Sequence, residues 1–458
     1  MEVFLKPRSV ALVGVPRKER PGAYVTLLNL LESFDGDVYP VNPHASEILG
    51  VKAYRSIKDV PADVDLTVIS TKRELVPQMV EECVEKGVHG VIIVTQGFAE
   101  ADAEGQALQE EIVRTAKAGG VRVLGPNTMG VLNAFNGFST TFGSLHGVPL
   151  QERRMPVAIV SQTGFFVLGV GELFPGKFVD LGNMCDVDFV DALEYFEKDE
   201  ETELIILHME GLHGKDGRRF LEAVMRVARR KPILVLKTGR SEKGAELAAS
   251  HTGAMTGNYR VYTAALRQAG AFVVSDIDEL QDFTKAFLRL PPLRGAGVAV
   301  ITYAGAAGVM VADVVEECGL RLSELSTETI ARIQRWMPAW MQVRNPVDIW
   351  VGAMAHGPSK VYEDVIRAVL CDEDVAALLC IYFAPMTEGH AKIDVSDVIK
   401  EVAAEFEKPV VVWLYGYPSA EYVRKLERGR NVAVFPTIRR AVQALAFLNA
   451  VSSRLGSH

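Results

Sequence analysis

The sequence is poor in cysteine and contains no cysteine pair at the spacing that zinc sites use. Its 458 residues include five cysteines, which are odd in number and scattered along the chain (Cys83, Cys185, Cys318, Cys371 and Cys380). A disulfide framework or a zinc knuckle is therefore not expected. We expect a reduced, cytoplasmic protein.

Long apolar runs and an excess of positive charge are also missing. No stretch of about 18 uncharged apolar residues occurs, so no membrane-spanning helix is expected. Charged residues interrupt the N-terminal segment, which argues against a secretory signal. Lys and Arg total 49 against 58 Asp and Glu, a net charge of −9. Because phosphate backbones are bound by basic surfaces, we expect no nucleic-acid partner.

Two nucleotide-binding motifs are absent. The first strand is followed by Gly14–Gly22, which is not Gly-x-Gly-x-x-Gly, and the second by Asn42-Pro43-His44 instead of the acid that would hold an NAD ribose. The chain also has no Walker A sequence. These absences argue against a nicotinamide-dependent oxidoreductase, which is one alternative function.

The first 125 residues alternate short apolar runs with amphipathic stretches of helical period. The apolar runs are 10–15, 37–41, 65–70, 90–95 and 122–125. Buried runs separated by helices predict a parallel, doubly wound sheet, which binds ligands beyond the carboxyl ends of its strands. We predict a Rossmann-like domain over residues 1–128.

The rest of the chain contains two stretches that resemble each other. Val157–Gly164 aligns with Val298–Gly305 (298 − 157 = 141), and Lys231–Gly239 aligns with Lys408–Gly416 (408 − 231 = 177). The matching segments occur in the same order, which favours duplication over convergence on a common strand–glycine–helix pattern. We predict two flavodoxin-like, doubly wound α/β domains, 155–290 and 296–452, after a Gly-, Phe- and Thr-rich connection and separated by a Pro/Gly-rich linker.

Five cations gather where the first and third strands of the first domain end. They are Arg17, Lys18, Arg20, Lys72 and Arg73. In an acidic protein such a group at one sheet edge indicates a polyphosphate ligand. A solvated, charge-rich loop is the alternative.

His251 stands among small residues in Ser250-His251-Thr252-Gly253, which we expect to be a loop before a helix that starts near Asn258. Imidazole is a nucleophile at neutral pH and can carry a phosphoryl group. Glu210 follows a buried strand and could accept a hydrogen bond from the imidazole. Taken alone, an exposed loop histidine and a surface carboxylate are the simpler interpretations.

Two strand ends lead into small-residue turns. Ser161-Gln162-Thr163-Gly164 ends one strand and opens a helical segment, and Thr302–Gly308 is its counterpart in the third domain. Hydroxyls and free N–H groups at such a turn can hold an oxyanion or a phosphate. Small residues at these turns are also common for steric reasons alone.

Several motifs together resemble the α subunit of NDP-forming acyl-CoA synthetases, the archaeal-type ADP-forming acetyl-CoA synthetases related to succinyl-CoA synthetase. The motifs run in family order and are Tyr39-Pro-Val-Asn-Pro43, Glu47-Ile-Leu-Gly50, Thr95-Gln-Gly-Phe98, Gly125-Pro-Asn127, Ser161-Gln-Thr-Gly164, Leu181-Gly-Asn183, Ser250-His-Thr-Gly253 and Asn345-Pro-Val-Asp348. The resemblance implies the reaction acyl-CoA + phosphate + ADP ⇌ carboxylic acid + CoA + ATP, through an acyl phosphate and a phosphohistidine.

The same resemblance implies roles for individual residues. His251 would be the phosphorylated nucleophile and Glu210 its partner. Phosphate would be held at one turn by Ser161, Gln162, Thr163 and Gly164, and at the other by Gly305 and Ala306. Coenzyme A would be contacted by Gly14, Val15, Pro16, Arg17, Gly22, Asn42, Pro43, His44, Ser70, Thr71, Thr95, Gln96 and Asn127.

The resemblance also implies a partner, because the three predicted domains leave no room for the family's ATP-grasp domain. We expect that domain, with ADP or ATP and Mg²⁺, on a β subunit in an α2β2 assembly. The sequence departs from the family pattern at Val15-Pro16, His44, Phe165-Phe166 and Tyr303. Bulky residues at both phosphate turns leave a second function open, a CoA-binding regulatory paralogue without turnover. Retention of both His251 and Glu210 argues against it.

Overall fold

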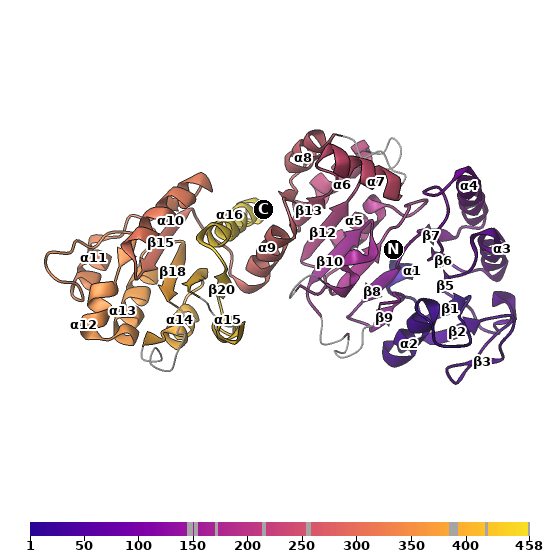
Figure 1. Ribbon diagram of the computed structural model, residues 1–458, viewed down its shortest axis with the longest axis horizontal. Coiled ribbons are helices and arrows are strands. Elements are labelled where there is room, and N and C mark those ends of the chain that lie inside the picture. The colour runs from indigo at the N-terminus through magenta and orange to yellow at the C-terminus, as the bar shows by residue number, and fades with distance from the viewer. Residues whose placement is uncertain are drawn as a thin grey trace. The chain divides into compact units, whose positions relative to one another are not determined.

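The computed structural model describes residues 1–143, 150, 154–169, 173–212, 217–252, 258–383, 393–416 and 420–456, without the side chains of Leu168 and of residues 248–252. It divides into two compact units, Met1–Ile277 and Asp278–His458, and each is described by itself (Figure 1). Among the described residues, no helix combines the length and apolar character that crossing a membrane requires.

The first sheet is a parallel sheet of five strands in the order β2-β1-β5-β6-β7. Its strands are β1 (Ser9–Val13), β2 (Asp37–Val41), β5 (Leu66–Ile69), β6 (Gly90–Ile93) and β7 (Arg122–Leu124), with a small ribbon of β3 (Glu47–Ile48) and β4 (Val51–Lys52) after β2. The helices are α1 (Glu2–Leu5), α2 (Ala23–Ser33), α3 (Val76–Lys86) and α4 (Ala103–Ala118), with 3₁₀ turns η1 (Ile57–Asp59) and η2 (Arg73–Leu75). Strands β1, β5 and β6 are buried throughout, as expected for central strands covered on both faces.

The second sheet has seven strands in the order β14-β13-β12-β10-β11-β8-β9. The strands are β8 (Val131–Asn133), β9 (Phe138–Ser139), β10 (Val157–Ser161), β11 (Lys177–Asp180), β12 (Leu204–Met209), β13 (Ile233–Lys237) and β14 (Phe272–Val274). Its helices are η4 (Gly164–Leu168), α5 (Phe189–Lys198), α6 (Gly217–Val227), α7 (Glu242–Thr252) and α8 (Tyr259–Gln268). The segment expected as a plain connection thus supplies β8 and β9, which pair antiparallel at the sheet edge.

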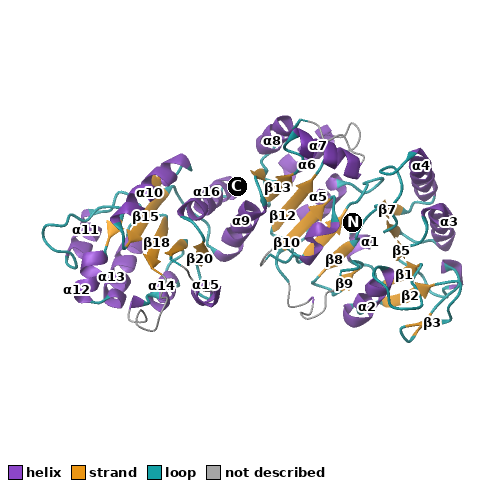
Figure 2. Ribbon diagram, viewed as in Figure 1, coloured by secondary structure: helices purple, strands orange, loops and turns teal. Residues whose placement is uncertain are grey.

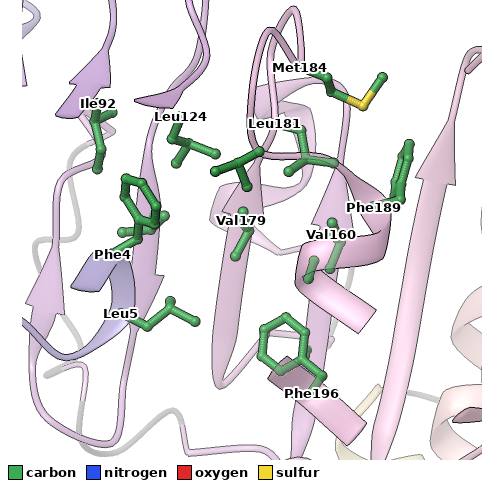
Figure 3. Close-up of a cluster of buried hydrophobic side chains, with 14 of the residues drawn as sticks. Phe4, Leu5, Ile92, Leu124, Val160, Val179, Leu181, Met184, Phe189 and Phe196 are labelled. Carbon is green, nitrogen blue, oxygen red and sulfur yellow. The ribbon is translucent and has the colours of Figure 1, made fainter. Parts of the chain in front are cut away.

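The first two sheets share one hydrophobic core. Phe4 and Leu5 of α1 are fully buried in the same cluster as Leu124 of the first sheet and Val160 of the second (Figure 3). The short α1 therefore packs both sheets into one unit.

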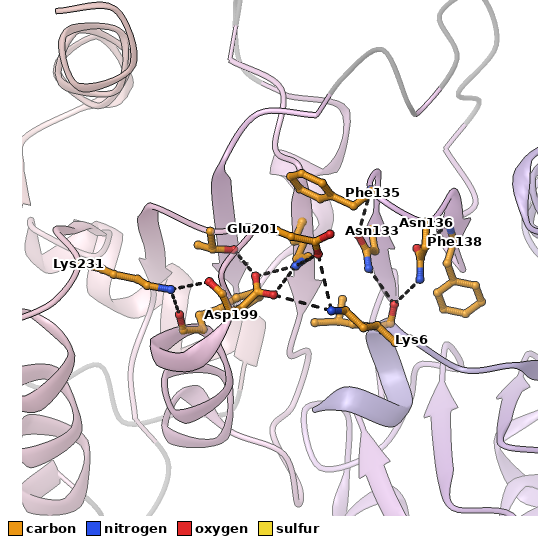
Figure 4. A network of polar contacts seen from close by, with 12 residues as sticks. Lys6, Asn133, Phe135, Asn136, Phe138, Asp199, Glu201 and Lys231 are labelled. Atoms are coloured by element: carbon orange, nitrogen blue, oxygen red, sulfur yellow. Dashed lines mark hydrogen bonds and ion pairs between the residues drawn. The ribbon is translucent and has the colours of Figure 1, made fainter. Parts of the chain in front are cut away.

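A polar network lies close to α1 at the amino edge of the second sheet (Figure 4). The fully buried Nζ of Lys177 donates to both carboxylate oxygens of Asp199 (2.6 Å each) and to Glu201 (2.7 Å). Nζ of Lys231 donates to the main-chain oxygen of Asp199 (2.6 Å), and Lys6 lies 3.7 Å from Glu201. Every buried charge in this network therefore has a partner of opposite sign or a carbonyl.

The second unit contains the third sheet, with the order β16-β15-β18-β19-β20 and β17 paired to β15 (Figure 2). Its strands are β15 (Gly297–Thr302), β16 (Arg321–Leu322), β17 (Val347–Asp348), β18 (Ala377–Phe383), β19 (Val410–Tyr415) and β20 (Val432–Phe435). Its helices are α9 (Ile277–Arg289), whose first residue ends the first unit, α10 (Gly305–Glu317), α11 (Thr327–Gln334), α12 (Trp350–His356), α13 (Pro358–Cys371), α14 (Ser396–Ala403), α15 (Ala420–Glu427) and α16 (Ile438–Leu455).

In each of the three sheets one strand has a parallel neighbour on either side, and both neighbours follow it in the chain. In the first sheet β1 lies between β2 and β5, in the second β10 lies between β11 and β12, and in the third β15 lies between β16 and β18. The two neighbours of this strand lie on opposite sides of it, which creates a switch point, where open α/β sheets bind ligands. The α/β fold class predicted from the sequence is confirmed, and the parallel parts of the second and third sheets have corresponding orders, β11-β10-β12-β13-β14 and β16-β15-β18-β19-β20.

Candidate active site

At the switch point of the first sheet the main chain has no room for a side chain at position 14. Gly14 has φ +88°, and a Cβ there would lie 2.0 Å from the carbonyl oxygen of Ser70. The Ser70 N–H donates to Val13 O (3.0 Å), which joins the ends of β1 and β5. Gly14, Ser70 and Thr71 are thus brought together where the sequence predicted coenzyme A contacts.

The other predicted coenzyme A residues follow the remaining strand ends. Asn42 Nδ2 donates to Val15 O (2.7 Å), and Thr95 Oγ1 donates to Thr71 O (2.8 Å). The Asn127 N–H donates to Thr95 O (3.0 Å) at a φ of 60°. Val15 differs from the rest because its side chain is fully buried in the core, so only its main chain could face a ligand.

Of the five cations predicted to gather at this edge, one forms ion pairs with neighbouring carboxylates. Arg73 donates to Asp102 (2.8 Å) and Glu104 (2.9 Å), and the hydrogen bond to Asp102 raises its pKa. Arg17, Lys18, Arg20 and Lys72 are exposed, as are Pro43 and His44. Four cations are therefore accessible to an anion at this edge, whereas Arg73 binds the carboxylates at the start of α4.

At the end of β10 the Ser161 hydroxyl is buried and hydrogen-bonds His208 Nδ1 (3.1 Å) on the adjacent strand β12. The Thr163 N–H donates to Ser161 Oγ (3.1 Å), and Thr163 caps η4. This helical segment is a five-residue 3₁₀ turn, shorter than the helix the sequence suggested. A Cβ at Gly164 would lie 2.1 Å from Met129 Sδ, which explains the glycine.

Gln162 connects this turn to the end of β12. Its side chain is 3% exposed, and Oε1 accepts hydrogen bonds from the N–H groups of Glu210 (2.6 Å) and Gly211 (3.1 Å). Its Nε2 is buried and has no hydrogen-bond partner among the described residues.

A cavity of about 410 Å³ joins the first sheet's edge to the Ser161–Gly164 turn. Its lining residues are Val94, Gln96, Asn127, Thr128, Met129, Phe142, Gln162, Thr163, Gly164, Phe165, Val167, Asp180, Gly182 and Asn183. Predicted coenzyme A contacts and predicted phosphate contacts therefore line one space.

Asp180 and Asn183 also line this cavity, and neither of them was assigned a function from the sequence. The carboxylate of Asp180 accepts from the N–H groups of Met129 (2.7 Å) and Gly182 (3.1 Å), and Asn183 Nδ2 donates to Glu100 (2.5 Å). The sequence could have indicated Asp180 only by its position at the end of a strand. Asp180 ends β11, which runs parallel to β10, so both strand ends meet at one sheet edge.

A second cavity of about 660 Å³ lies on the other side of the same turn, and Thr163 and Phe165 line both spaces. It is also lined by Glu210, which is 9% exposed, and by His208 and Thr238.

Lys237 lies behind this second cavity, at the end of β13. Its Nζ donates to the main-chain oxygens of Glu210 (2.8 Å) and Thr238 (2.6 Å). Burial lowers the pKa of Lys237 to about 8, although the nearby Glu210 acts to raise it. Lys237 thereby fastens the ends of β12 and β13 beneath the cavity.

The segment that carries His251 is helical up to Thr252, whereas the sequence suggested a loop. Gly244 and Leu247 of this helix, α7, line the same cavity as Glu210. The side chain of His251 lies outside the described part of the chain, so its pairing with Glu210 stays a prediction.

The counterpart turn lies in the second unit. Gly305 and Ala306 are exposed at the start of the thirteen-residue α10, and Ala304 N–H donates to Thr302 Oγ1 (3.0 Å). Gly305 lines a cavity of about 520 Å³ with Thr302 and Asp348. Tyr303 is buried against Tyr362 and Trp350, so this bulky departure from the family pattern points into the core. Phe165, by contrast, is 66% exposed.

The class to which these sheets and turns belong is defined by three family models, which together match most of the chain. A CoA binding domain matches residues 8–134, a succinyl-CoA ligase like flavodoxin domain matches 154–287, and a Ligase-CoA domain matches 298–447. The architecture is therefore that of a CoA-binding, succinyl-CoA-ligase-like protein.

Full-length relatives narrow this class. The chain is 36% identical to the acetate–CoA ligase [ADP-forming] II subunit alpha of Pyrococcus furiosus over 93% of each chain. It is 36% identical to the acetate–CoA ligase [ADP-forming] I of Archaeoglobus fulgidus over 99% of this chain and 64% of that protein. The solved Ca. Korarchaeum cryptofilum dinucleotide forming acetyl-coenzyme A synthetase 1 in complex with phosphate and ADP superposes with a TM-score of 0.85, at 35% identity over 100% of this chain and 98% of the other. The chain belongs to the ADP-forming acetate–CoA ligase family of acid–thiol ligases, and is of the α-subunit type.

Proposed function

We propose that this chain is the α subunit of an ADP-forming acyl-CoA synthetase that catalyses acyl-CoA + phosphate + ADP ⇌ carboxylic acid + CoA + ATP. The observation that carries the proposal is the pair of cavities on either side of the Ser161–Phe165 turn. One cavity reaches the CoA-type sheet edge, and the other contains Glu210 and α7. An acyl group and a phosphoryl group could thus be handled on opposite sides of one turn.

Coenzyme A is proposed to bind along the carboxyl edge of the first sheet. The turn Gly14–Gly22 and the ends of β2, β5, β6 and β7 supply main-chain and polar groups there. Arg17, Lys18, Arg20 and Lys72 are exposed at the same edge and suit the phosphates of this ligand.

The first chemical step takes place in the 410 Å³ cavity. A phosphate oxygen attacks the thioester carbonyl carbon, a C–O bond forms, the C–S bond breaks, and its electron pair leaves on the CoA sulfur. The products are an acyl phosphate and CoA. The Gly164 N–H and the Thr163 hydroxyl, which belong to residues that line this cavity, are proposed to hold the phosphate.

The second step transfers the phosphoryl group to His251. A ring nitrogen forms the P–N bond while the P–O bond to the acyl group breaks, which releases the carboxylate. Glu210 accepts a hydrogen bond from the other ring nitrogen and keeps the attacking nitrogen unprotonated. Gly305 and Ala306 at the start of α10 are a second proposed phosphate contact.

The last step, phosphorylation of ADP, is assigned to a partner. We propose an ATP-grasp β subunit in an α2β2 assembly, with Mg²⁺ bound together with the nucleotide on that subunit. The relative from A. fulgidus supports this because about a third of its length lies beyond the part that matches this chain.

The test is the intact mass of the protein after incubation with an acyl-CoA and phosphate. The wild type should gain one acid-labile phosphoryl group, and His251→Ala should not. His89→Ala, which removes an exposed histidine just before β6, is a matched control for general damage and should still be phosphorylated.

The competing function is a CoA-binding paralogue without turnover. It predicts that the wild type binds CoA but gains no phosphoryl group with any acyl-CoA, even when a β subunit is added. That result would overturn the proposed function.

A further inference from the structure

Only the oxygen of the buried Gln162 carboxamide forms hydrogen bonds with the described part of the protein. Its Oε1 accepts two main-chain hydrogen bonds, and its buried Nε2 has none among the described residues. Leaving a buried donor unpaired costs about 1–3 kcal/mol. A ligand acceptor at this atom would remove that cost.

The orientation of this amide is fixed by its neighbours. If Oε1 and Nε2 exchanged places, the amide NH₂ would face the N–H groups of Glu210 and Gly211, donor against donor. Nε2 is therefore the atom left for a ligand, and Gln162 lines the 410 Å³ cavity.

The chemistry of the cavity favours a neutral acceptor. Among the described residues that line it there is no Lys or Arg, and the carboxylate of Asp180 is bound to two main-chain N–H groups. Amides of Gln96, Asn127 and Asn183 and the apolar side chains of Val94, Met129, Phe142 and Val167 make up much of the rest. A neutral thioester carbonyl therefore suits the part of the cavity next to Nε2, and the attacking phosphate is proposed to lie at the Thr163 hydroxyl and the Gly164 N–H of the same turn.

We infer that Gln162 Nε2–H donates a hydrogen bond to the acyl carbonyl oxygen of the CoA thioester and stabilises the oxyanion formed when phosphate attacks. This rests on the proposed function. As the C–O bond to phosphate forms, the carbonyl π electrons move onto that oxygen. They return when the C–S bond breaks and the electron pair leaves on sulfur. A preorganised donor aimed at such an oxygen typically contributes 10²–10³-fold in rate.

The same carboxamide also links the two cavities. Because Oε1 holds the main-chain N–H of Glu210, the donor to the acyl oxygen and the proposed partner of His251 are fixed by one side chain. Gln162 is thus a catalytic residue for acyl transfer and a positioning residue for Glu210.

The experiment separates the two ends of the amide in the full-length chain. Gln162→Glu keeps the acceptor for Glu210 and Gly211 but replaces the donor with an oxygen, and Gln162→Met removes both. The assay is CoA release from acyl-CoA with arsenate in place of phosphate at pH 8, because the acyl arsenate formed is hydrolysed by water and the reaction goes forward. Gln78→Met, at an exposed glutamine of α3, is the matched control.

Both Gln162 variants should lose about 10²–10³-fold in kcat, with the KM for arsenate within about threefold of wild type. The carbonyl stretching band of bound acyl-CoA should lie at lower frequency in the wild type than in Gln162→Glu. Gln78→Met should match the wild type in every assay. If Gln162→Met does not fold, Gln162→Glu alone still decides the result.

Wild-type kcat in Gln162→Glu, or a raised KM for arsenate with kcat retained, would overturn the inference. The latter result would show that Nε2 binds the phosphate. If the wild type itself releases no CoA from any acyl-CoA, even when a β subunit is added, the proposed function fails instead, so the two failures are distinguishable.

Discussion

At the scale of single residues, the most crowded contact in the site is that between Gly164 and Met129. A Cβ at position 164 would lie 2.1 Å from Met129 Sδ and 2.2 Å from its Cγ. Both residues line the 410 Å³ cavity, so a methyl group at 164 must push the methionine side chain into the space proposed for the acyl group. Glycine is therefore required at position 164 both by the packing against Met129 and by the shape of the cavity.

Gly164→Ala should lower the free energy of unfolding by about 1–3 kcal/mol through overpacking and should raise the KM for acyl-CoA. Met129→Ala in the same chain should restore much of both losses, because it removes the atoms that the new methyl group meets. Urea unfolding and steady-state kinetics measure the two effects. Gly217→Ala is the control, since a Cβ there meets nothing within 4 Å. Equal damage from both alanines would show that the contact with Met129 is not the cause.

The sequence predicted which residues form this turn, but not the reason for them. Ser161-Gln162-Thr163-Gly164 could be placed at a strand end because strand, glycine and helix follow one another in the chain. Met129, Asp180 and Asn183 are distant from the turn in the sequence and lie near it only in the folded protein. Local sequence patterns therefore could not predict that they line the same cavity. The unpaired Nε2 of Gln162 could be seen only once Glu210 and Gly211 were known to occupy Oε1.

At the scale of elements, the network around Lys177 fixes β11 to the segment after α5 and lies close to α1. Lys177 Nζ is fully buried and bonded to Asp199 and Glu201, and Thr202 Oγ1 also donates to Asp199 (2.6 Å). The network was not foreseen from the sequence, because β11 and the antiparallel strands β8 and β9 lie in segments without strong apolar runs. The buried central strands β10, β12 and β13 were predicted correctly, because each of them is a clear apolar run in the sequence.

Lys177→Met should destabilise the first unit by about 3–5 kcal/mol, because buried Asp199 then loses the cation that hydrogen-bonds both of its oxygens and keeps, of the described cations paired with it, only Lys6, 4.0 Å away. Urea denaturation followed by loss of CoA binding measures this. Lys243→Met removes a lysine from an exposed ion pair with Glu246, and it should cost at most about 0.5 kcal/mol. Similar small changes in both variants would contradict the role given to Lys177.

At the scale of the whole molecule, the two compact units carry different spectroscopic signals. All four tryptophans (Trp336, Trp340, Trp350 and Trp413) belong to the second unit. The proposed CoA edge and both cavities around Gln162 belong to the first. The order of predicted domains was readable from repeated strand–glycine–helix patterns, but the shared core of the first two sheets depends on α1, a four-residue helix with no periodic signal.

Asp394 makes the stability of the second unit dependent on acid. Partial burial acts to raise its pKa, but hydrogen bonds from Tyr422, Ser396 and Lys425 outweigh burial and hold the pKa at about 2, below its usual 3.8. A carboxyl group with a lowered pKa in the folded state stabilises that state above its unfolded pKa. The contribution, about 2 kcal/mol from this difference in pKa, should be complete above about pH 4 and lost as the pH falls to 2.

Asp394→Asn should therefore weaken the second unit by about 1–2 kcal/mol at neutral pH, and its difference from the wild type should shrink between pH 4 and pH 2. Urea midpoints from tryptophan fluorescence at pH 7, 4, 3 and 2.5 report this unit alone. Asp397→Asn alters a more exposed partner of the same Lys425 and should have a smaller effect. A difference between Asp394→Asn and the wild type that stays constant down to pH 2.5 would mean that the hydrogen bonds to Asp394 act independently of its charge. A difference that shrinks would show that ionised Asp394 contributes to the acid sensitivity of this unit.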